Sequence, residues 1–188
     1  MILSALNRRT NKYEDLSFRD LGAYDGYFTA FISPQAVGAA VKFFDLFNTS
    51  TSTVNLIVDK VVPIVDGSVA VTGAVTVNMQ LQRTTSVGTG GTAVTPGKHD
   101  TTTPNLPANV TIRKTPTGGA ALGADVLGFA SLYTDEQSPG PHSGPLINLI
   151  EAPIIVRPNS GLCVVQGAVA SVGSLAFLVG FRPELIAV

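Results

Sequence analysis

The clearest alternation of apolar and polar positions in this chain runs over Val69–Arg83. Apolar side chains or glycine occupy most odd positions, and small or polar side chains occupy the even ones. A period of two residues predicts a long β-strand with one face in the core and one toward solvent or a partner. The preceding run, Val54–Val65, predicts two strands or one bent strand, broken near Pro63. Because Asp66-Gly67 is a hairpin-turn signal, we expect the two runs to pair antiparallel.

The apolar runs near the end of the chain predict several short strands. They lie within Leu146–Phe181, and none reaches the roughly ten to twelve residues that favour a buried helix. Ile154–Val156 precedes the turn-forming cluster Arg157–Gly161, Leu162–Val165 follows it, and Leu175–Phe181 is the last run. A region this apolar and poor in charge must pack against another sheet of the same chain or against a second protein.

Shorter runs predict the remaining strands. Tyr27–Ile32 predicts a first strand closed by Ser33-Pro34, and Val37–Phe47 predicts a second. A short helix over Pro34–Ala40 is the alternative for this region, with Ser33 as its cap. Two further strands are expected at Val110–Lys114 and Val126–Tyr133.

Two long irregular segments separate these strands. In Thr84–Asn109, eight of the twenty residues from Thr84 to Thr103 are threonine, and Thr134–Pro145 is rich in proline and glycine. Loops of this length are usually functional or held by a partner. The fold expected is all-β: a single antiparallel β-sandwich over residues 27–188, jelly-roll-like, with an extended N-terminal arm over residues 1–26.

Composition narrows the classes of function. The chain has 188 residues, of which 45% are hydrophobic and 13% charged, and its net charge is −1. The charged fraction is about half that of a typical soluble domain, so neighbouring subunits are expected to cover part of the surface. A chain without excess positive charge lacks the field that neutralises phosphates, which argues against a nucleic-acid partner.

The single cysteine, Cys163, cannot form an intrachain disulfide and is expected to be a small buried apolar residue. The start of the chain, Met1–Leu6, has no basic region typical of a secretion signal. No apolar run approaches the roughly eighteen residues of a membrane span. We therefore expect no membrane partner, and a chain made in a reducing cytoplasm or in a particle assembled there.

Catalytic chemistry finds little support in the sequence. The two histidines, His99 and His142, lie in the two long loops without metal-ligand spacing, and neighbours on an extended chain such as His99 and Asp100 point to opposite sides. The run Val87–Thr92 shares only glycines with a phosphate-binding loop and is interpreted as a flexible loop. Asp135-Glu136 has no second carboxylate opposite it. We expect no enzyme, no cofactor and no metal.

Three segments resemble small structural proteins of tailed bacteriophages. They are Gly90–Asp100 (GGTAVTPGKHD), Ala108–Arg113 (ANVTIR) and, above all, Pro153–Val164 (PIIVRPNSGLCV), in which Arg157 and Pro158 match the pattern. The resemblance implies a component of the virion, assembled in the host cytoplasm and commonly trimeric. It implies a capsid decoration or cement protein, or a subunit of a tail or collar.

The leading hypothesis is a decoration protein that binds and stabilises the head shell as a homotrimer, with the major capsid protein or other virion proteins as partners. A carbohydrate- or receptor-binding tail subunit is one alternative, although Thr84–Asn109 holds no aromatic residue and the chain no tryptophan. A jelly-roll major capsid protein is another, although the arm balances four basic against four acidic residues. The aromatic cluster of Tyr24, Tyr27, Phe28 and Phe31 marks the junction of arm and body, where packing is the simpler interpretation. The candidate interface residues are Arg8, Arg9, Tyr24, Tyr27, Phe28 and Arg157.

Overall fold

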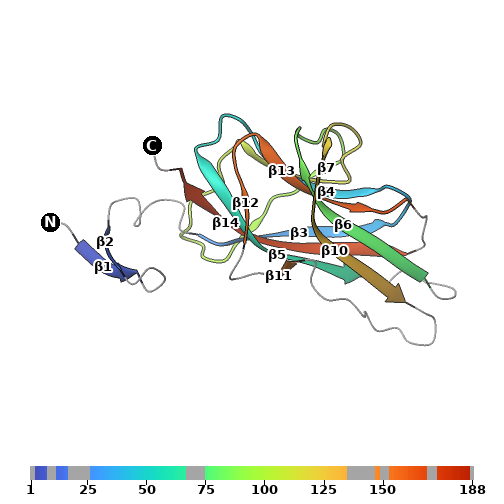
Figure 1. The fold of residues 1–188 in the computed structure, drawn as a ribbon, viewed down its shortest axis with the longest axis horizontal. Helices are drawn as coiled ribbons and strands as arrows, with labels where there is room; N and C mark the ends of the chain where they lie inside the picture. The colour runs from blue at the N-terminus through green and yellow to red at the C-terminus, as the bar shows by residue number, and fades with distance from the viewer. Residues whose placement is uncertain are drawn as a thin grey trace.

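The structure is a computed structural model that describes residues 3–7, 12–16, 26–66, 75–134, 147–148, 153–168 and 173–186. Within these ranges the chain forms fourteen β-strands and no helix. Apart from an N-terminal hairpin, the strands build two six-stranded antiparallel sheets packed into two layers (Figure 1). The predicted all-β antiparallel sandwich is therefore confirmed.

We name the two sheets I and II. Sheet I consists, in spatial order, of β10 (Leu122–Thr134), β6 (Val75–Thr84), β13 (Ser160–Gln166), β4 (Lys42–Asn48), β9 (Val110–Lys114) and β7 (Thr92–Ala93). Sheet II consists of β11 (Ile147–Asn148), β5 (Val54–Val65), β14 (Ser174–Leu185), β3 (Phe28–Ala36) and β8 (Gly97–Lys98), with β12 (Ile154–Val156) also paired to β5. The hairpin pairs β1 (Leu3–Asn7) with β2 (Lys12–Leu16).

Eight strands pair in a nested order. In chain order they are β3, β4, β5, β6, β10, β12, β13 and β14. The first of these pairs with the last, the second with the seventh, the third with the sixth and the fourth with the fifth. In addition β14 pairs with β5, and β13 with β6. Every connection between consecutive members except the one from β6 to β10 therefore crosses from one sheet to the other.

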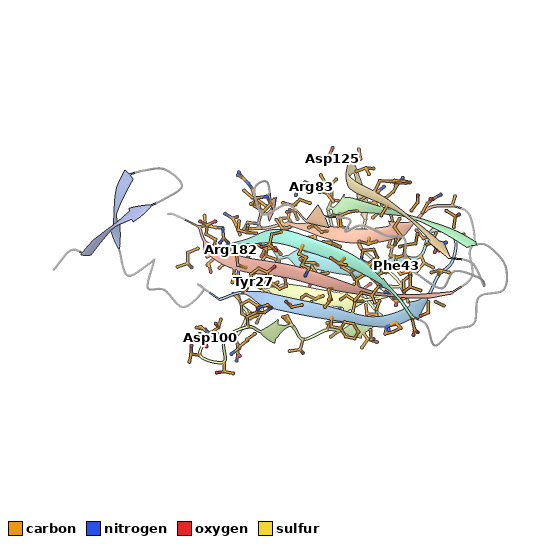
Figure 2. The ribbon with its side chains drawn as sticks, turned by 90° about the horizontal axis from the view of Figure 1, so that it is seen from below. Tyr27, Phe43, Arg83, Asp100, Asp125 and Arg182 are labelled. Atoms are coloured by element: carbon orange, nitrogen blue, oxygen red, sulfur yellow. The ribbon has the colours of Figure 1, made fainter. Side chains whose placement is uncertain are left out.

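The core between the sheets is apolar and rich in phenylalanine. Phe177 of β14 lies 5.1 Å from Phe43 and 5.8 Å from Phe44, measured between ring centroids, and all three rings are fully buried. Figure 2 labels Phe43 in the body of the sandwich, where its side chain is fully buried. Phe28 stacks on Phe181 in the same core. Each such side chain contributes about 1.5–3 kcal/mol by leaving water, so the core joins strands distant in sequence.

The predicted alternation holds where the structure describes it. In β6, Val77, Met79 and Leu81 are buried, while Thr76 and Asn78 are exposed. The predicted strand at Val110–Lys114 has the observed bounds of β9. Val54–Val65 is one strand, β5, which continues through Pro63.

The predicted pairing of Val54–Val65 with the alternating run is wrong. β5 lies in sheet II between β14 and the pair β11 and β12, whereas β6 lies in sheet I between β10 and β13. The expectation assumed a hairpin at Asp66-Gly67. A turn signal is local, however, and gives no information on which sheet the next strand joins. Residues 67–74, which connect β5 to β6, lie outside the described ranges.

The first strand is also longer than predicted, and its alternative helix is absent from residues 34–40. β3 continues through Ser33-Pro34 to Ala36, with a register shift against β14 at this point. On the other side β8 pairs only with Phe28 and Thr29. Among the described residues the edge beside Pro34 is unpaired, so the missing N–H of the proline interrupts no ladder there.

Thr84–Asn109 is not a plain loop. Its strand β7 pairs with β9 at one edge of sheet I, and its strand β8 pairs with β3 at one edge of sheet II. The segment therefore covers edges of both sheets on the same side of the sandwich, which shields their unpaired backbone groups. Of the second predicted loop, Thr134–Pro145, all but Thr134 lies outside the described residues, and of the predicted arm only β1, β2 and Gly26 lie inside them.

Candidate interaction surfaces

A buried aspartate fixes the glycine-rich segment to the outer face of sheet I. The carboxylate of Asp45, on β4, is fully buried and accepts hydrogen bonds from the Gly88 N–H (2.7 Å) and the Thr84 hydroxyl (3.0 Å). Burial raises the pKa of Asp45, against the opposing effect of these donors and of Lys42 and Arg113. Val87–Thr92, interpreted from sequence as flexible, is thus tied to the sheet.

The glycines of this segment allow close backbone approach. Gly91 has a φ of 62°, and a Cβ there would lie 2.5 Å from the carbonyl oxygen of Thr115. A Cβ at Gly88 would lie 2.9 Å from a carboxylate oxygen of Asp45. The backbone N–H of Thr89 donates to the Gly118 carbonyl. The glycines therefore serve the packing of residues 87–92 against residues 115–119.

A polar cluster forms around Tyr27, beside sheet II. The Tyr27 hydroxyl donates to the Asp59 carboxylate, and burial together with this bond raises the pKa of Tyr27. The ring of His99 meets the Tyr27 ring edge-on at 4.8 Å, and His99 Nε2 lies 2.7 Å from the Thr29 hydroxyl. The cluster therefore joins the threonine-rich segment to β3.

His99 and Asp100 engage different groups. A carboxylate oxygen of Asp100 accepts hydrogen bonds from the backbone N–H and the hydroxyl of Thr102, which lowers the pKa of Asp100. Across the described residues, no three or more histidine, cysteine, aspartate or glutamate side chains are grouped where they could hold a metal ion. The same residues include no helix of the length and apolarity needed to cross a membrane.

Exposed large apolar side chains lie on both sheets, and three of them share one strand. Among the described residues, the large hydrophobic side chains with high exposure are Phe31 (52%), Leu122 (38%), Val126 (50%), Phe129 (59%) and Ile155 (41%). Three of the five lie on β10, and the other two lie on strands of sheet II. Single exposed apolar residues are ordinary, whereas a contiguous exposed group is a candidate interaction surface.

The first surface, named the Phe31 face, is the part of sheet II formed by the exposed Phe31 and the half-buried Val62 and Leu178. Leu178 pairs with Phe31 on one side and with Val62 on the other, so the three side chains stand in one row across three strands. The row faces away from the core, because the neighbouring positions Ile32, Val61 and Val179 point inward.

The second surface, named the β10 strip, consists of Leu122, Val126 and Phe129. Val126 pairs with Gln82 and Phe129 with Gln80, positions that alternate with the buried Met79 and Leu81, so the strip lies on the outer side of sheet I. β10 pairs with β6 on one side and with no other described strand. With thirteen residues it is by far the longest edge strand among those described; β7, β8, β11 and β12 have two or three.

The residues predicted as an interface are not gathered into one site. Tyr27 is half-buried, Phe28 is a core residue with 2% exposure, and Arg157 is exposed in the turn between β12 and β13. Arg8, Arg9 and Tyr24 lie outside the described residues. Phe28 therefore follows the packing interpretation given to the aromatic cluster, while Phe31 of the same cluster is exposed.

The sequence pattern did not lead to a prediction of the β10 strip as an interaction surface. The run from Leu122 to Thr134 contains neither lysine nor proline, the residues that commonly protect an edge strand, and a single charge, Asp125. That signal was present, but it becomes meaningful only when the strand is known to lie at an edge.

Comparisons of the chain with protein-family models, with curated proteins and with solved structures find no match.

Proposed function

We propose that this chain is a virion structural protein that binds and stabilises the shell of a tailed bacteriophage head as an oligomer. The observation that carries the proposal is the group of exposed apolar side chains on the β10 strip, together with the exposed Phe31 on sheet II. The core is already closed without them, since Phe43, Phe44 and Phe177 are fully buried. Surfaces of this kind are stabilised by burial against further protein.

The nested strand order supports an assembly role at the level of the fold. First-with-last pairing of eight antiparallel strands, wound over two sheets, is the arrangement of a jelly roll, and we infer that the sandwich belongs to this architecture. Jelly rolls are frequent in virus capsids and also in lectins and other proteins. Because a fold hosts many functions, the order supports the proposal without carrying it.

Electron microscopy of the virus particle tests the proposed function. Antibodies raised against the purified chain are coupled to gold and applied to purified particles, with pre-immune serum as the control. Labelling over the head at regular positions is the expected result. Labelling of the tail or collar would support the alternative placement, and particles that lack the chain altogether would contradict both.

A second candidate function, a carbohydrate-binding tail subunit, is favoured by the Tyr27 cluster. The threonine-rich segment has no aromatic residue of its own, but it lies against the ring of Tyr27 beside Asp59 and Thr29. An aromatic ring with polar groups around it is a common element of ligand sites. A glycan array would show selective binding that Tyr27→Ala abolishes and that Thr101→Ala, an exposed control, retains; no binding by the wild-type chain would eliminate this candidate.

A further inference from the structure

We propose that two glycine-rich connections on the outer face of sheet I form one strap, which opens as a unit while both sheets stay folded and thereby uncovers Cys163. The strap consists of residues 85–91, in the connection from β6 to β7, and residues 116–121, in the connection from β9 to β10. Neither half belongs to a strand, so the strap can lift without breaking a ladder of either sheet. Its opening is a property of the isolated chain, independent of the proposed function.

The two halves of the strap are hydrogen-bonded to each other. The backbone N–H of Thr89 donates to the Gly118 carbonyl (2.7 Å). The Thr89 carbonyl accepts from the N–H groups of Thr117 (3.0 Å) and Gly118 (3.2 Å). Farther along, the Thr85 N–H donates to the Ala121 carbonyl (2.9 Å). Lifting one half alone would break these bonds, so the halves are expected to move together.

Three charged side chains of sheet I hold the strap by its backbone. The contacts run from the Gly88 N–H to Asp45 (2.7 Å), from Arg113 to the Gly90 carbonyl (3.0 Å) and from Lys42 to the Gly119 carbonyl (3.3 Å). The three side chains come from β4 and β9, within the sheet. The strap is therefore attached at separate polar points on both of its halves.

Apolar packing contributes little to the closed position of the strap. Its buried residues are Gly88, Pro116 and Ala120, while Val87 is half-buried and the remaining positions are half-buried or exposed. A segment with few buried apolar contacts and exposed hydrogen bonds has a lower local stability than a packed core. The strap is therefore expected to open at a smaller cost in free energy than the unfolding of the sandwich.

The backbone conformation of the second half also favours opening. Thr115, directly before this half, has a φ of 47°, and Ala120 within it has a φ of 44°. The left-handed region is unfavourable for residues that have a Cβ, and such conformations persist where the surrounding contacts enforce them. Opening releases both residues from this conformation.

Cys163 lies on the strap's side of sheet I. It is paired directly with Asp45, and the side chains of directly paired residues lie on the same face of a sheet. The Asp45 carboxylate faces the strap, since it accepts from Gly88. The Cys163 side chain is fully buried although this face is the outer one. The strap is therefore expected to contribute to its cover.

Hydrogen exchange of single backbone amides, measured by NMR, tests the opening. Arg113→Ala removes one contact between sheet and strap, with Lys42→Ala as a second variant of the same kind. Val179→Ala weakens the core at sheet II, and Lys60→Ala, at an exposed basic residue of sheet II, is the control. In the same buffer, the rate at which N-ethylmaleimide labels Cys163 is measured relative to the rate in urea.

The core variant gives the decisive result. The strap amides of the wild type exchange as one group, about tenfold or more faster than those of β14 after correction for intrinsic rates. Val179→Ala speeds the exchange of β14 by about tenfold or more and leaves the strap group unchanged, because opening of the strap does not expose the core. Labelling of Cys163 is slow, since the reagent reaches the thiol in the open form alone, and Val179→Ala does not change its rate.

The strap variants give the complementary result. Arg113→Ala speeds the exchange of strap and core amides by the same factor, about five- to tenfold, because both local opening and global unfolding break the contact to Gly90. Labelling of Cys163 accelerates by that factor too. Lys60→Ala changes none of these rates.

Other outcomes overturn the inference. Strap amides that exchange as slowly as β14 and are equally accelerated by Val179→Ala would show that the strap opens only when the sandwich unfolds. Strap amides without protection would contradict the closed strap, and halves with different exchange rates would show two independent loops. A Cys163 labelling rate that Val179→Ala raises together with the exchange of β14 would show that the strap does not control access to the thiol.

Discussion

Replacing Asp45 by asparagine separates the effect of the buried charge from that of the buried hydrogen bonds. In the wild type, one carboxylate oxygen accepts from the Gly88 N–H and the other from the Thr84 hydroxyl. An asparagine oxygen can accept from Gly88, and its amide can donate to the Thr84 hydroxyl, which both donates and accepts. Asp45→Asn therefore keeps both contacts and removes the charge.

Asp45→Ala removes both contacts. It leaves the Gly88 N–H and the Thr84 hydroxyl buried without this acceptor, and each unsatisfied group costs about 1–3 kcal/mol. Removing a carboxylate whose ionised form is disfavoured by burial offsets part of that cost. We expect a net loss of about 2–4 kcal/mol in the free energy of unfolding, which lowers Tm by about 5–15 °C for a chain of this size.

The pH dependence distinguishes the asparagine variant from the wild type. The pKa of Asp45 is raised above 3.8 in the folded chain, so between 3.8 and the folded value the folded state binds more protons than the unfolded state. The wild-type free energy of unfolding falls as pH rises through this window, by about 1.4 kcal/mol for each unit of pKa difference. Asp45→Asn lacks this term, so its stability relative to the wild type rises across the window and is constant above it.

Urea unfolding followed by circular dichroism from pH 4 to pH 8, at one protein concentration, measures these differences. Glu184→Gln, which neutralises an exposed carboxylate, is the control and is expected to change stability by less than about 0.5 kcal/mol. The reasoning is refuted if Asp45→Asn is as unstable as Asp45→Ala at every pH. It is also refuted if Asp45→Ala leaves stability unchanged.

Three further predictions concern Gly161, Tyr27 and Cys163. Gly161→Ala should lower the free energy of unfolding by about 1–3 kcal/mol, because its Cβ would lie 2.6 Å from the Leu46 carbonyl oxygen; thermal unfolding measures this, and an unchanged Tm would contradict it. Tyr27 should ionise above the usual tyrosine pKa of 10.0, so the absorbance at 295 nm should show a titration step at higher pH that Tyr27→Phe lacks. The free energy of unfolding should fall as pH rises above 10.0, because the folded chain retains the Tyr27 proton that the unfolded chain loses. Cys163 should not react with a thiol reagent in the native chain, because burial raises the pKa of its thiol to about 12, and should react fully in urea; rapid native labelling would contradict its burial.

The sequence alone determined the class of the fold and the position of many strands. The alternation through Val77, Met79 and Leu81 and the run Val110–Lys114 predicted strands that the structure contains. These predictions succeed because a strand's period of two residues, its turn chemistry and its apolar composition are local properties that can be read from neighbouring residues. The burial of Cys163 was predictable for the same reason, since it lies in a continuous apolar run.

The tertiary structure decided which strands pair and which apolar side chains stay exposed. β5 and β6 are neighbours in sequence but lie in different sheets. β5 pairs with β14 and β6 pairs with β13, and both partners come from near the end of the chain. Phe28 and Phe31 are three residues apart, yet one is core and the other surface, because an odd separation in a strand places side chains on opposite faces of the sheet. Asp45 and Gly88 meet across forty-three positions. Contacts of this length depend on how the whole chain packs, which local pattern does not specify.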